Sequence, residues 1–415
     1  MTELVSEDPR LIVDQQGVRG LVSMAGRRIR QGELGALPVL LGLILIALVF
    51  QVQDSNFLTP LNLTNLMAQI APVGVISVGV VLILLLGEID LSVGSVSGFC
   101  AAIMAVLSVK HGVSGPIALI AGVAAGALIG LFNGLMRAKV GVPSFIVTLA
   151  GFIGFSGALL YTLGDTGTVN LTDPFIINLV NLLLPVWLGW AIALAVLGAY
   201  TLVVVVSRAR RRASGLRPEP LLIDALRVGV LAAGVIIGVA VMSTDRGRLI
   251  PIQGVPLGVV IFLGLIAMFQ LITRRTTFGR HLYAVGGNEE AARRAGINVD
   301  RVRIAVFVLC SALAAFGGIL AASRGYAVNQ SSGGGDVLLD AIAAAVIGGT
   351  SLFGGRGAVT TALLGSLVIG SIANGMDLLA LQSSVKFMIT GGVLLAAVTV
   401  DAVARRGRMS AGRVA

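Results

Sequence analysis

TNLMAQIAPVGVISVGVVLILLL, residues 64–86, holds 23 positions without a single charged residue. A helix of about 20 apolar residues crosses the roughly 30 Å hydrocarbon core of a bilayer. Similar stretches recur along the whole chain of 415 residues, of which 56% are hydrophobic and 12% charged, whereas soluble domains average about 25% charged residues. Strands of a membrane barrel would alternate in polarity, and these stretches do not. We therefore predict an all-α polytopic membrane protein.

Twelve membrane segments are predicted from these apolar stretches. Two of them, 91–109 and 337–352, are short or interrupted by glycine, so we expect broken half-helices there. The twelve segments are 35–52, 64–86, 91–109, 115–136, 144–163, 183–206, 221–242, 255–272, 304–323, 337–352, 357–376 and 385–403.

The distribution of Lys and Arg predicts the orientation. With the N-terminus in the cytoplasm, 25 of the 30 basic residues fall on the cytoplasmic side and 5 on the outer side, as the positive-inside rule requires. Both termini are then cytoplasmic, with tails at 1–34 and 404–415 around a transmembrane domain at 35–403. Residues 1–34 mix five acidic with five basic residues, so the first apolar run is interpreted as an uncleaved anchor rather than a signal peptide.

The net charge of +10 is explained by these flanking residues, so we predict no nucleic-acid partner. Cys100 and Cys310 are single cysteines in apolar surroundings, and His111 and His281 are isolated. These residues predict neither a disulfide nor a metal site, and no set of nucleophile, base and acid is evident. The chain is therefore not expected to be an enzyme.

Residues 207–220, SRARRRASGLRPEP, form an Arg-rich connector on the predicted cytoplasmic side. We interpret it as a topological anchor, with regulation or binding of anionic lipid as the alternative.

Four glycines are spaced four residues apart in GVAAGALIGLFNG, at positions 122–134. This spacing places them on one helical face, where another backbone can approach closely. We predict helix packing at this face, with a pore-lining role as the alternative. The four residues are Gly122, Gly126, Gly130 and Gly134.

The segment GEIDLSVG, residues 87–94, interrupts the apolar pattern with two carboxylates. Charges at this depth are costly unless they face water or a partner, and irregular backbone survives there only inside protein or beside a cavity. Asp90 could cap the following helix. Alternatively, the segment lines or gates the translocation path, through Glu88, Asp90, Ser92 and Gly94.

A second interruption, IGGTSLFGGRG at 347–357, holds five glycines, which permit backbone shapes closed to other residues. Paired breaks in two halves of a chain often mark a translocation path. We therefore assign Gly348, Gly349 and Thr350 to the same path or gate.

The polar stretch 273–303 is predicted to be a cytoplasmic loop that carries a short capped helix. Asn288 suits the N-cap, and Glu289 and Glu290 suit the first turn, where the helix dipole favours negative charge. Arg293 and Arg294 follow four residues after each acid, in the favourable order. Gly296 is a natural stop, and Ala291 and Ala292 keep the helix thin enough to enter a cleft. An ordinary connector helix is the alternative.

The chain lacks the nucleotide-binding loop that an ATPase needs. Such a loop requires Gly-Lys followed by Ser or Thr. The three lysines, Lys110, Lys139 and Lys386, follow Val, Ala and Val, so any ATP must be hydrolysed by another subunit.

Three motifs, GEIDLSVGS (87–95), GGNEEAARRAGI (286–297) and IGGTSLFGGRG (347–357), resemble those of sugar-importing ABC permeases of the ribose/xylose class in order and spacing. The resemblance covers residues 40–403. The apparent extra pair of segments at 183–206 and 221–242 resembles the D-xylose branch.

This resemblance implies a bacterial plasma-membrane importer. Its partners would be a second permease copy, a cytoplasmic ATPase that carries ATP and Mg²⁺, an extracytoplasmic sugar-binding protein, and membrane lipid; the chain itself would bind no cofactor. The motif match assigns ATPase coupling to Asn288, Glu289, Glu290, Ala291, Ala292 and Gly296.

Two other functions remain open at this stage. One is an ABC permease for ribose, galactose or another small solute, such as a branched-chain amino acid. The other is an ion-coupled secondary transporter, for which Glu88, Asp90 or Asp340 would be the candidate carboxylate.

Overall fold

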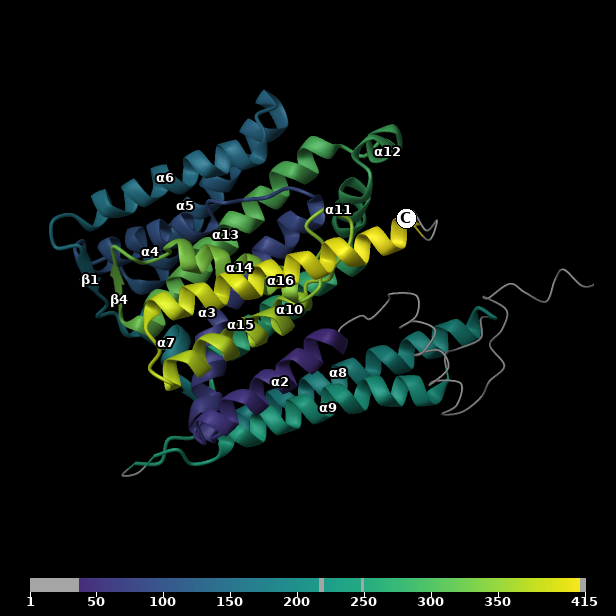
Figure 1. Ribbon diagram of the computed structural model, residues 1–415, viewed down its shortest axis with the longest axis horizontal. Helices are drawn as coiled ribbons and strands as arrows, with labels where there is room; N and C mark the ends of the chain where they lie inside the picture. Colours follow the sequence, from purple (N-terminus) through teal and green to yellow (C-terminus); the bar gives the residue numbers. More distant parts are fainter. Residues whose placement is uncertain (1–36, 216–219, 248–249, 411–415) are drawn as a thin grey trace, which may run out of the picture.

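The computed structural model describes residues 37–215, 220–247 and 250–410, which form a bundle of elongated helices (Figure 1). Each of the twelve predicted segments coincides with a helix. These helices are α2 (Leu37–Gln53), α3 (Pro60–Leu86), α4 (Val93–Val109), α5 (Gly115–Leu135), α6 (Ser144–Leu163), α8 (Val186–Ala213), α9 (Leu221–Ser243), α10 (Leu257–Arg275), α13 (Val299–Gly325), α14 (Gly335–Ile347), α15 (Thr361–Leu378) and α16 (Ser383–Ser410).

Eight helices among the described residues are long and apolar enough to cross a membrane. The chain is therefore a polytopic helical membrane protein, while twelve crossings and their direction stay predictions. The predicted tail 1–34 and part of the Arg-rich connector lie outside the described residues. The eight are α3, α5 with the π-helical turn η1 (Met136–Val140), α6, α8, α9, α10, α13 and α15.

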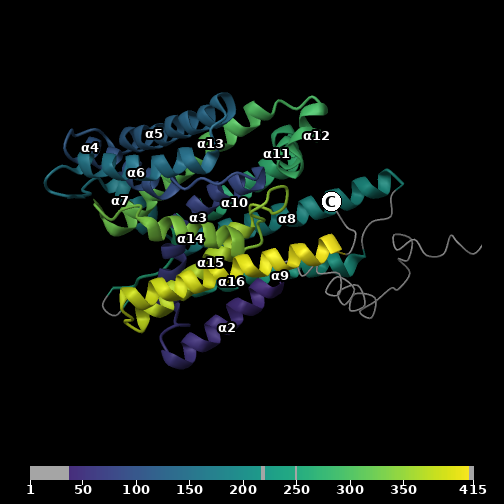
Figure 2. The ribbon, with the colours of Figure 1, turned by 45° about the horizontal axis from the view of Figure 1, so that its top comes forward.

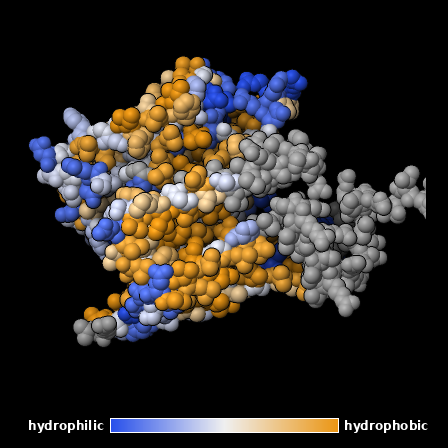
Figure 3. Space-filling view, viewed as in Figure 1, coloured by the Kyte–Doolittle hydropathy of each residue, from blue (hydrophilic) through white to orange (hydrophobic). Residues whose placement is uncertain are grey.

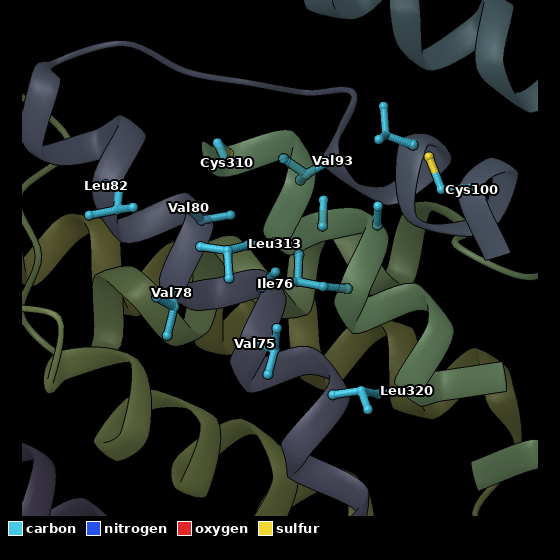
Figure 4. Packing of buried hydrophobic residues seen from close by; sticks show 14 of the residues in the cluster. Val75, Ile76, Val78, Val80, Leu82, Val93, Cys100, Cys310, Leu313 and Leu320 are labelled. Carbon is cyan, nitrogen blue, oxygen red and sulfur yellow. The ribbon is translucent and has the colours of Figure 1, made fainter. Parts of the chain in front are cut away.

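Helices α3 and α13 form the centre of the bundle. Almost every residue of α3 from Ile70 to Leu86 is buried, and α13 packs against α3, α4 and α5. Figure 4 shows Val75, Ile76 and Val78 of α3 beside Leu313 and Leu320 of α13. A helix that is apolar on all sides can be buried at the centre, so α3 occupies that position.

Helices α8 and α9 pair with each other at the edge of the bundle (Figures 1 and 2). Only Gly189 and Ala193 of α8 and Met242 of α9 are buried. Their remaining apolar side chains contribute to the hydrophobic surface seen in Figure 3. Helix α8 continues to Ala213, beyond the predicted end at residue 206, so the first half of the Arg-rich connector is helical.

The connections between the helices contain regular structure that the all-α prediction did not include. Strand β1 (Thr168–Asn170) pairs antiparallel with β4 (Ala327–Asn329), and β2 (Leu183–Leu184) pairs with β3 (Val255–Pro256). Helix α7 (Pro174–Asn181) begins at Asp173, whose carboxylate accepts from the backbone N–H groups of Phe175 and Ile176.

Two further short helices, α11 (Thr277–Gly287) and α12 (Glu289–Arg294), lie within the predicted 273–303 loop. They lie at the opposite end of the bundle from β1 and β4, on the same side as the C-terminal end of α16 (Figure 1).

Candidate functional site

Helix α12 begins as the sequence predicts. The Asn288 side chain accepts from the backbone N–H of Ala291 at 2.9 Å. Arg293 donates to Glu289 at 3.0 Å, and Arg294 pairs with Glu290. The predicted N-cap and both charge pairs are confirmed.

The end of α12 is also confirmed. Gly296 has φ +83°, its N–H bonds the carbonyl of Arg293, and the N–H of Ile297 bonds that of Ala292. This pair of bonds is a Schellman stop, which satisfies the last free carbonyls of a helix. Helix α12 therefore holds its own shape despite having only six residues.

The two faces of α12 differ. Ala292 is buried against the core of the bundle, and its predicted contact with a partner stays a prediction. Asn288, Glu290, Ala291 and Gly296 are exposed. These four residues form the face that a partner can reach.

Glu289 keeps 43% of its side chain accessible and joins a cluster of charges. Its Oε2 accepts from Nη2 of Arg303 at 2.8 Å. The Nε of the same arginine donates to Oε1 of Glu88 at 3.0 Å, and Nε of Arg137 donates to that oxygen at 2.8 Å. Arg303 is 4% exposed and Glu88 8%. The first break, η1, α12 and α13 thus meet in one ionic network, which is buried at Glu88 and Arg303 and partly exposed at Glu289.

This network gives Glu88 two partners that the sequence did not indicate. Glu88 contacts Arg137 and Arg303, and its predicted place in the path or gate stays a prediction. A buried carboxylate requires a cationic partner, but no spacing rule pairs residue 88 with residue 303. Sequence reasoning therefore missed Arg137 and Arg303.

The charge state of Glu289 depends on both of its arginines. Burial raises the pKa of Glu289, but Arg303 and Arg293 outweigh burial and hold the pKa below its ordinary value of 4.5. A carboxylate with a depressed folded pKa contributes stability above its unfolded pKa and loses it as the pH falls through the folded value. The contact with Arg303 is therefore charged at neutral pH.

Glycines bring the three motifs of the sequence into backbone contact. The N–H of Gly355 donates to the carbonyl of Leu85 at 2.9 Å. A Cβ on Gly286 would lie 1.8 Å from that carbonyl oxygen, and a Cβ on Gly354 would lie 3.0 Å from the Cα of Gly87. Gly354 and Gly355 have φ of +83° and +70°, a region that favours glycine. The start of the first break (87–94), the end of α11 and the second break (347–357) thus meet at one place.

Replacing Gly286 by alanine is expected to destabilise this junction, because a methyl group cannot fit against the Leu85 carbonyl. The neighbouring Gly287→Ala variant is the matched control, since a Cβ there meets nothing within 4 Å. Overpacking of this kind costs about 1–3 kcal/mol. Thermal stability in detergent should fall for Gly286→Ala and not for Gly287→Ala; equal melting of both variants would contradict the assigned contact.

The start of α4 lies beyond an extended stretch that crosses the top of Figure 4, between the helices that carry Leu82 and Cys100. Asp90 does not cap the first turn of α4 as proposed. Its Oδ1 accepts from the N–H of Ser92 at 2.8 Å and from the Ser92 hydroxyl at 2.6 Å. Ser92 is itself the N-cap residue, so Asp90 fixes the residue that precedes the helix.

The glycines of α4 face the loop before α14. A Cβ on Gly94 would lie 3.0 Å from the carbonyl oxygen of Gly333, and one on Gly98 would lie 2.0 Å from that of Ser332. Helix α4 therefore makes direct contact with the backbone of the loop that leads into α14.

The second break packs against α15. Helix α14 ends at Ile347 rather than 352, and α15 begins at Thr361 rather than 357, because glycines occupy the intervening positions. A Cβ on Gly348 would lie 2.0 Å from the Thr361 carbonyl oxygen. The hydroxyl oxygens of Thr350 and Thr361 lie 2.7 Å apart, and Gly349 has φ +110°.

The glycine stripe of α5 lies along α13. Added Cβ atoms would lie 2.5 Å from the Ala315 Cβ at Gly126, 2.3 Å from the Phe307 oxygen at Gly130, and 2.9 Å from the Ile304 Cα at Gly134. Gly122, the fourth member, would meet the Cys100 carbonyl oxygen of α4 at 2.9 Å. All four glycines are buried, so this geometry favours packing over lining a pore.

Comparison with known proteins places the chain in a family. The model of the branched-chain amino acid transport system / permease component family matches residues 62–398. The chain is 36% identical to the xylose transport system permease protein XylH of Escherichia coli (strain K12), over 85% of this chain and 88% of the relative.

Two further relatives extend this similarity. The XylH protein of Haemophilus influenzae is 34% identical over 90% of this chain and 98% of its own. The ribose import permease protein RbsC of Bacillus subtilis is 31% identical over 89% and 94%. No solved structure matches the chain. The chain therefore belongs to this family of transport-system permease components, whose members are membrane transport subunits rather than enzymes.

Proposed function

We propose that this chain is the permease subunit of an ATP-driven importer that carries a monosaccharide, with D-xylose as its substrate. The observation that carries this proposal is the junction of the three motifs beside a capped, exposed helix at one end of a membrane bundle. Relatives that are named for xylose transport and match nearly full length support the choice of sugar.

A cytoplasmic ATPase subunit is the proposed partner of α12. Asn288, Glu290, Ala291 and Gly296 are exposed and would contact it, while Glu289 and Ala292 anchor the helix to the bundle. ATP and Mg²⁺ would bind to that partner and supply the energy. The positive-inside charge distribution supports a cytoplasmic α12 and cytoplasmic termini.

A second copy of the chain and an extracytoplasmic sugar-binding protein would complete the importer. A polar hollow lined by Thr166, Thr168, Asn329 and Gln330 lies at the end of the bundle opposite α12 and suits contact with that protein or its sugar. The two breaks, including Asp90, Ser92 and Gly94 before and within α4, would gate the path. A bacterial plasma membrane is the proposed location, with lipid against the exposed sides of α8 and α9.

Reconstitution tests the proposed function. Proteoliposomes that contain the chain and its ATPase, with sugar-binding protein on the opposite side, should take up radiolabelled xylose only when ATP is present on the α12 side. Unlabelled xylose should compete more strongly than ribose, which is the second candidate because of the RbsC relative.

Two outcomes of this assay would favour an alternative sugar or an alternative mechanism. Stronger competition by ribose would reassign the sugar. Uptake by the chain alone, driven by a proton or sodium gradient, would contradict the ATP-driven mechanism and favour an ion-coupled transporter. The carboxylate variants Asp90→Asn and Asp340→Asn would then identify the coupling residue.

A further inference from the structure

A single buried guanidinium, that of Arg303, contacts both α12 and the first break. Its Nη2 donates to Glu289, the first residue of α12, and its Nε donates to Glu88, which follows α3 by two positions. Arg303 itself belongs to α13, one of the two central helices. The consecutive helices α12 and α13 are therefore joined through one side chain to the first break, which is 215 residues away from Arg303 in sequence.

The chemistry of arginine makes this connection stiff. The guanidinium is planar and presents its N–H groups in a fixed fork, so two carboxylates bound to it keep a defined separation. Charge-assisted bonds of this kind are about twice as strong as neutral ones. The pair of Arg303 with Glu88 is buried and therefore little screened by salt, while the Glu289 side chain is partly exposed. Movement of Glu289 would therefore move Arg303 or Glu88 as well, rather than being absorbed by solvent.

A second set of contacts joins the end of α11, directly before α12, to the second break. Gly286 and Gly287, the last two residues of α11, lie against Gly354 and Gly355 of the second break. The Tyr283 hydroxyl of α11 also donates to the Gly357 carbonyl at 2.9 Å. These contacts surround the ionic connection and limit the directions in which α12 can move independently.

The surroundings of Glu88 allow the contact between Arg303 and α12 to be removed while Glu88 keeps a cationic partner. Arg137 donates to the same carboxylate oxygen, so Glu88 keeps a cationic partner when Arg303 is changed. Breaking a buried ion pair is most damaging when it leaves an uncompensated charge. Variants at position 303 therefore cut the contact with α12 without leaving the Glu88 carboxylate alone.

We propose that Arg303 is a positioning residue that transmits movement of α12 to the break between α3 and α4. This inference rests on the proposed function, in which an ATPase moves α12. The break continues from Glu88 through Ile89 and Asp90 to Ser92, the N-cap of α4. A displacement of Glu88 is thereby carried along an extended stretch to the start of α4, without any contact between the ATPase and the path.

The Arg303→Lys variant tests whether the planar geometry of the guanidinium is required. Lysine keeps the positive charge but presents a compact ammonium on a flexible stem, which cannot hold Glu88 and Glu289 in the two-sided geometry. We expect Arg303→Lys to assemble with the ATPase and to hydrolyse ATP, while sugar uptake for each ATP consumed falls about fivefold or more, within the usual range of coupling between sites.

Labelling of a cysteine at position 89 provides a direct readout of the break. Ile89 is 38% exposed, whereas Cys100 and Cys310 are both fully buried, so Ile89→Cys introduces an accessible thiol beside unreactive native ones. In the assembled importer, its rate of reaction with a charged maleimide should change between the nucleotide-free state and the state with a non-hydrolysable ATP analogue. In the Arg303→Lys background this change should be lost.

Lys139→Gln is the matched control. Lys139 pairs with Asp300 at 2.8 Å at the same end of the molecule. Asp300 feels the charges of Arg293 and Arg303, but the pair itself does not include Glu88, Glu289 or Arg303. The control should keep both the nucleotide-dependent labelling and the uptake for each ATP. A merely structural role of Arg303 would lower the amount of folded protein but would leave this ratio unchanged in the molecules that assemble.

Two results would overturn the inference. One is an unchanged labelling response and uptake ratio in Arg303→Lys; the other is the absence of any labelling response at position 89 in a protein that imports sugar with ATP. If Arg303→Lys fails to fold, Glu289→Gln cuts only the α12 side of the connection and is measured in the same way. Failure of the proposed function is distinguishable, because the parent protein would then show no ATP-dependent uptake.

Discussion

Replacing Gly130 by leucine is expected to prevent the bundle from assembling normally. A Cβ at this position would lie 2.3 Å from the Phe307 carbonyl oxygen and 2.7 Å from the Cα of Val308. Both atoms belong to the backbone of α13, so no side chain can rotate away to make room. Overpacking costs about 1–3 kcal/mol and occasionally more; because whole helices must separate here, we expect at least about 3 kcal/mol. The yield of monodisperse protein after gel filtration in detergent measures the effect.

Gly154→Leu is the control for this prediction. Gly154 is an exposed residue of α6, and a Cβ there meets nothing within 4 Å. Leucine also has a better helix propensity than glycine by roughly 0.8 kcal/mol, so this variant should be recovered in normal yield. Normal recovery of Gly130→Leu would show that α5 does not pack on α13 through its glycine face.

The double variant Glu290→Arg, Gly296→Arg is expected to abolish ATP-dependent uptake while leaving the chain in the membrane. Glu290 is exposed, with 73% of its side chain accessible, and a cation there would face Arg294 and the positive end of the helix dipole. Arginine at Gly296 would have to adopt φ +83°, at a cost of roughly 1–2 kcal/mol. We expect the exposed face of α12 to lose both its charge pattern and its shape. Uptake should therefore fall by more than the roughly tenfold expected when one contact with the ATPase is merely weakened.

Co-purification of the ATPase with the permease measures docking directly in this variant. Arg210→Glu is the control, since it reverses one exposed charge at the end of α8 without touching α12. Its ATPase association and uptake should remain normal. Normal association and uptake in the double variant as well would remove α12 from the coupling role.

The features that were predicted accurately from the sequence depend on residues that lie close together along the chain. Asn288, Glu290 and Gly296 were assigned as cap, first-turn acid and stop, and the structure confirms the cap and the stop. Each of these contacts links residues within five positions, where helical geometry alone decides which groups meet. The apolar segments were found for a similar reason, because membrane thickness sets their length.

The features that the sequence did not indicate depend on residues that are distant in sequence. Ala292 is buried, because the rotation of a short helix about its own axis is set by the bundle beneath it; its role in coupling stays a prediction. Glu88 binds arginines at positions 137 and 303, and its place in the path likewise stays a prediction. The short strands were missed because pairs of two or three residues form only where folded helices bring separate segments together.

The sequence by itself therefore determined a helical membrane protein, the placement of its apolar segments, and a self-capped helix within one of three glycine-bearing motifs. Hydrocarbon thickness, charge asymmetry and local hydrogen bonding suffice for each of these features. Only the tertiary structure decided that the three motifs touch one another and that Arg303 connects α12 to the first break. Backbone contact at glycine and the burial of an ion pair depend on how separate helices pack, and no local pattern encodes that arrangement.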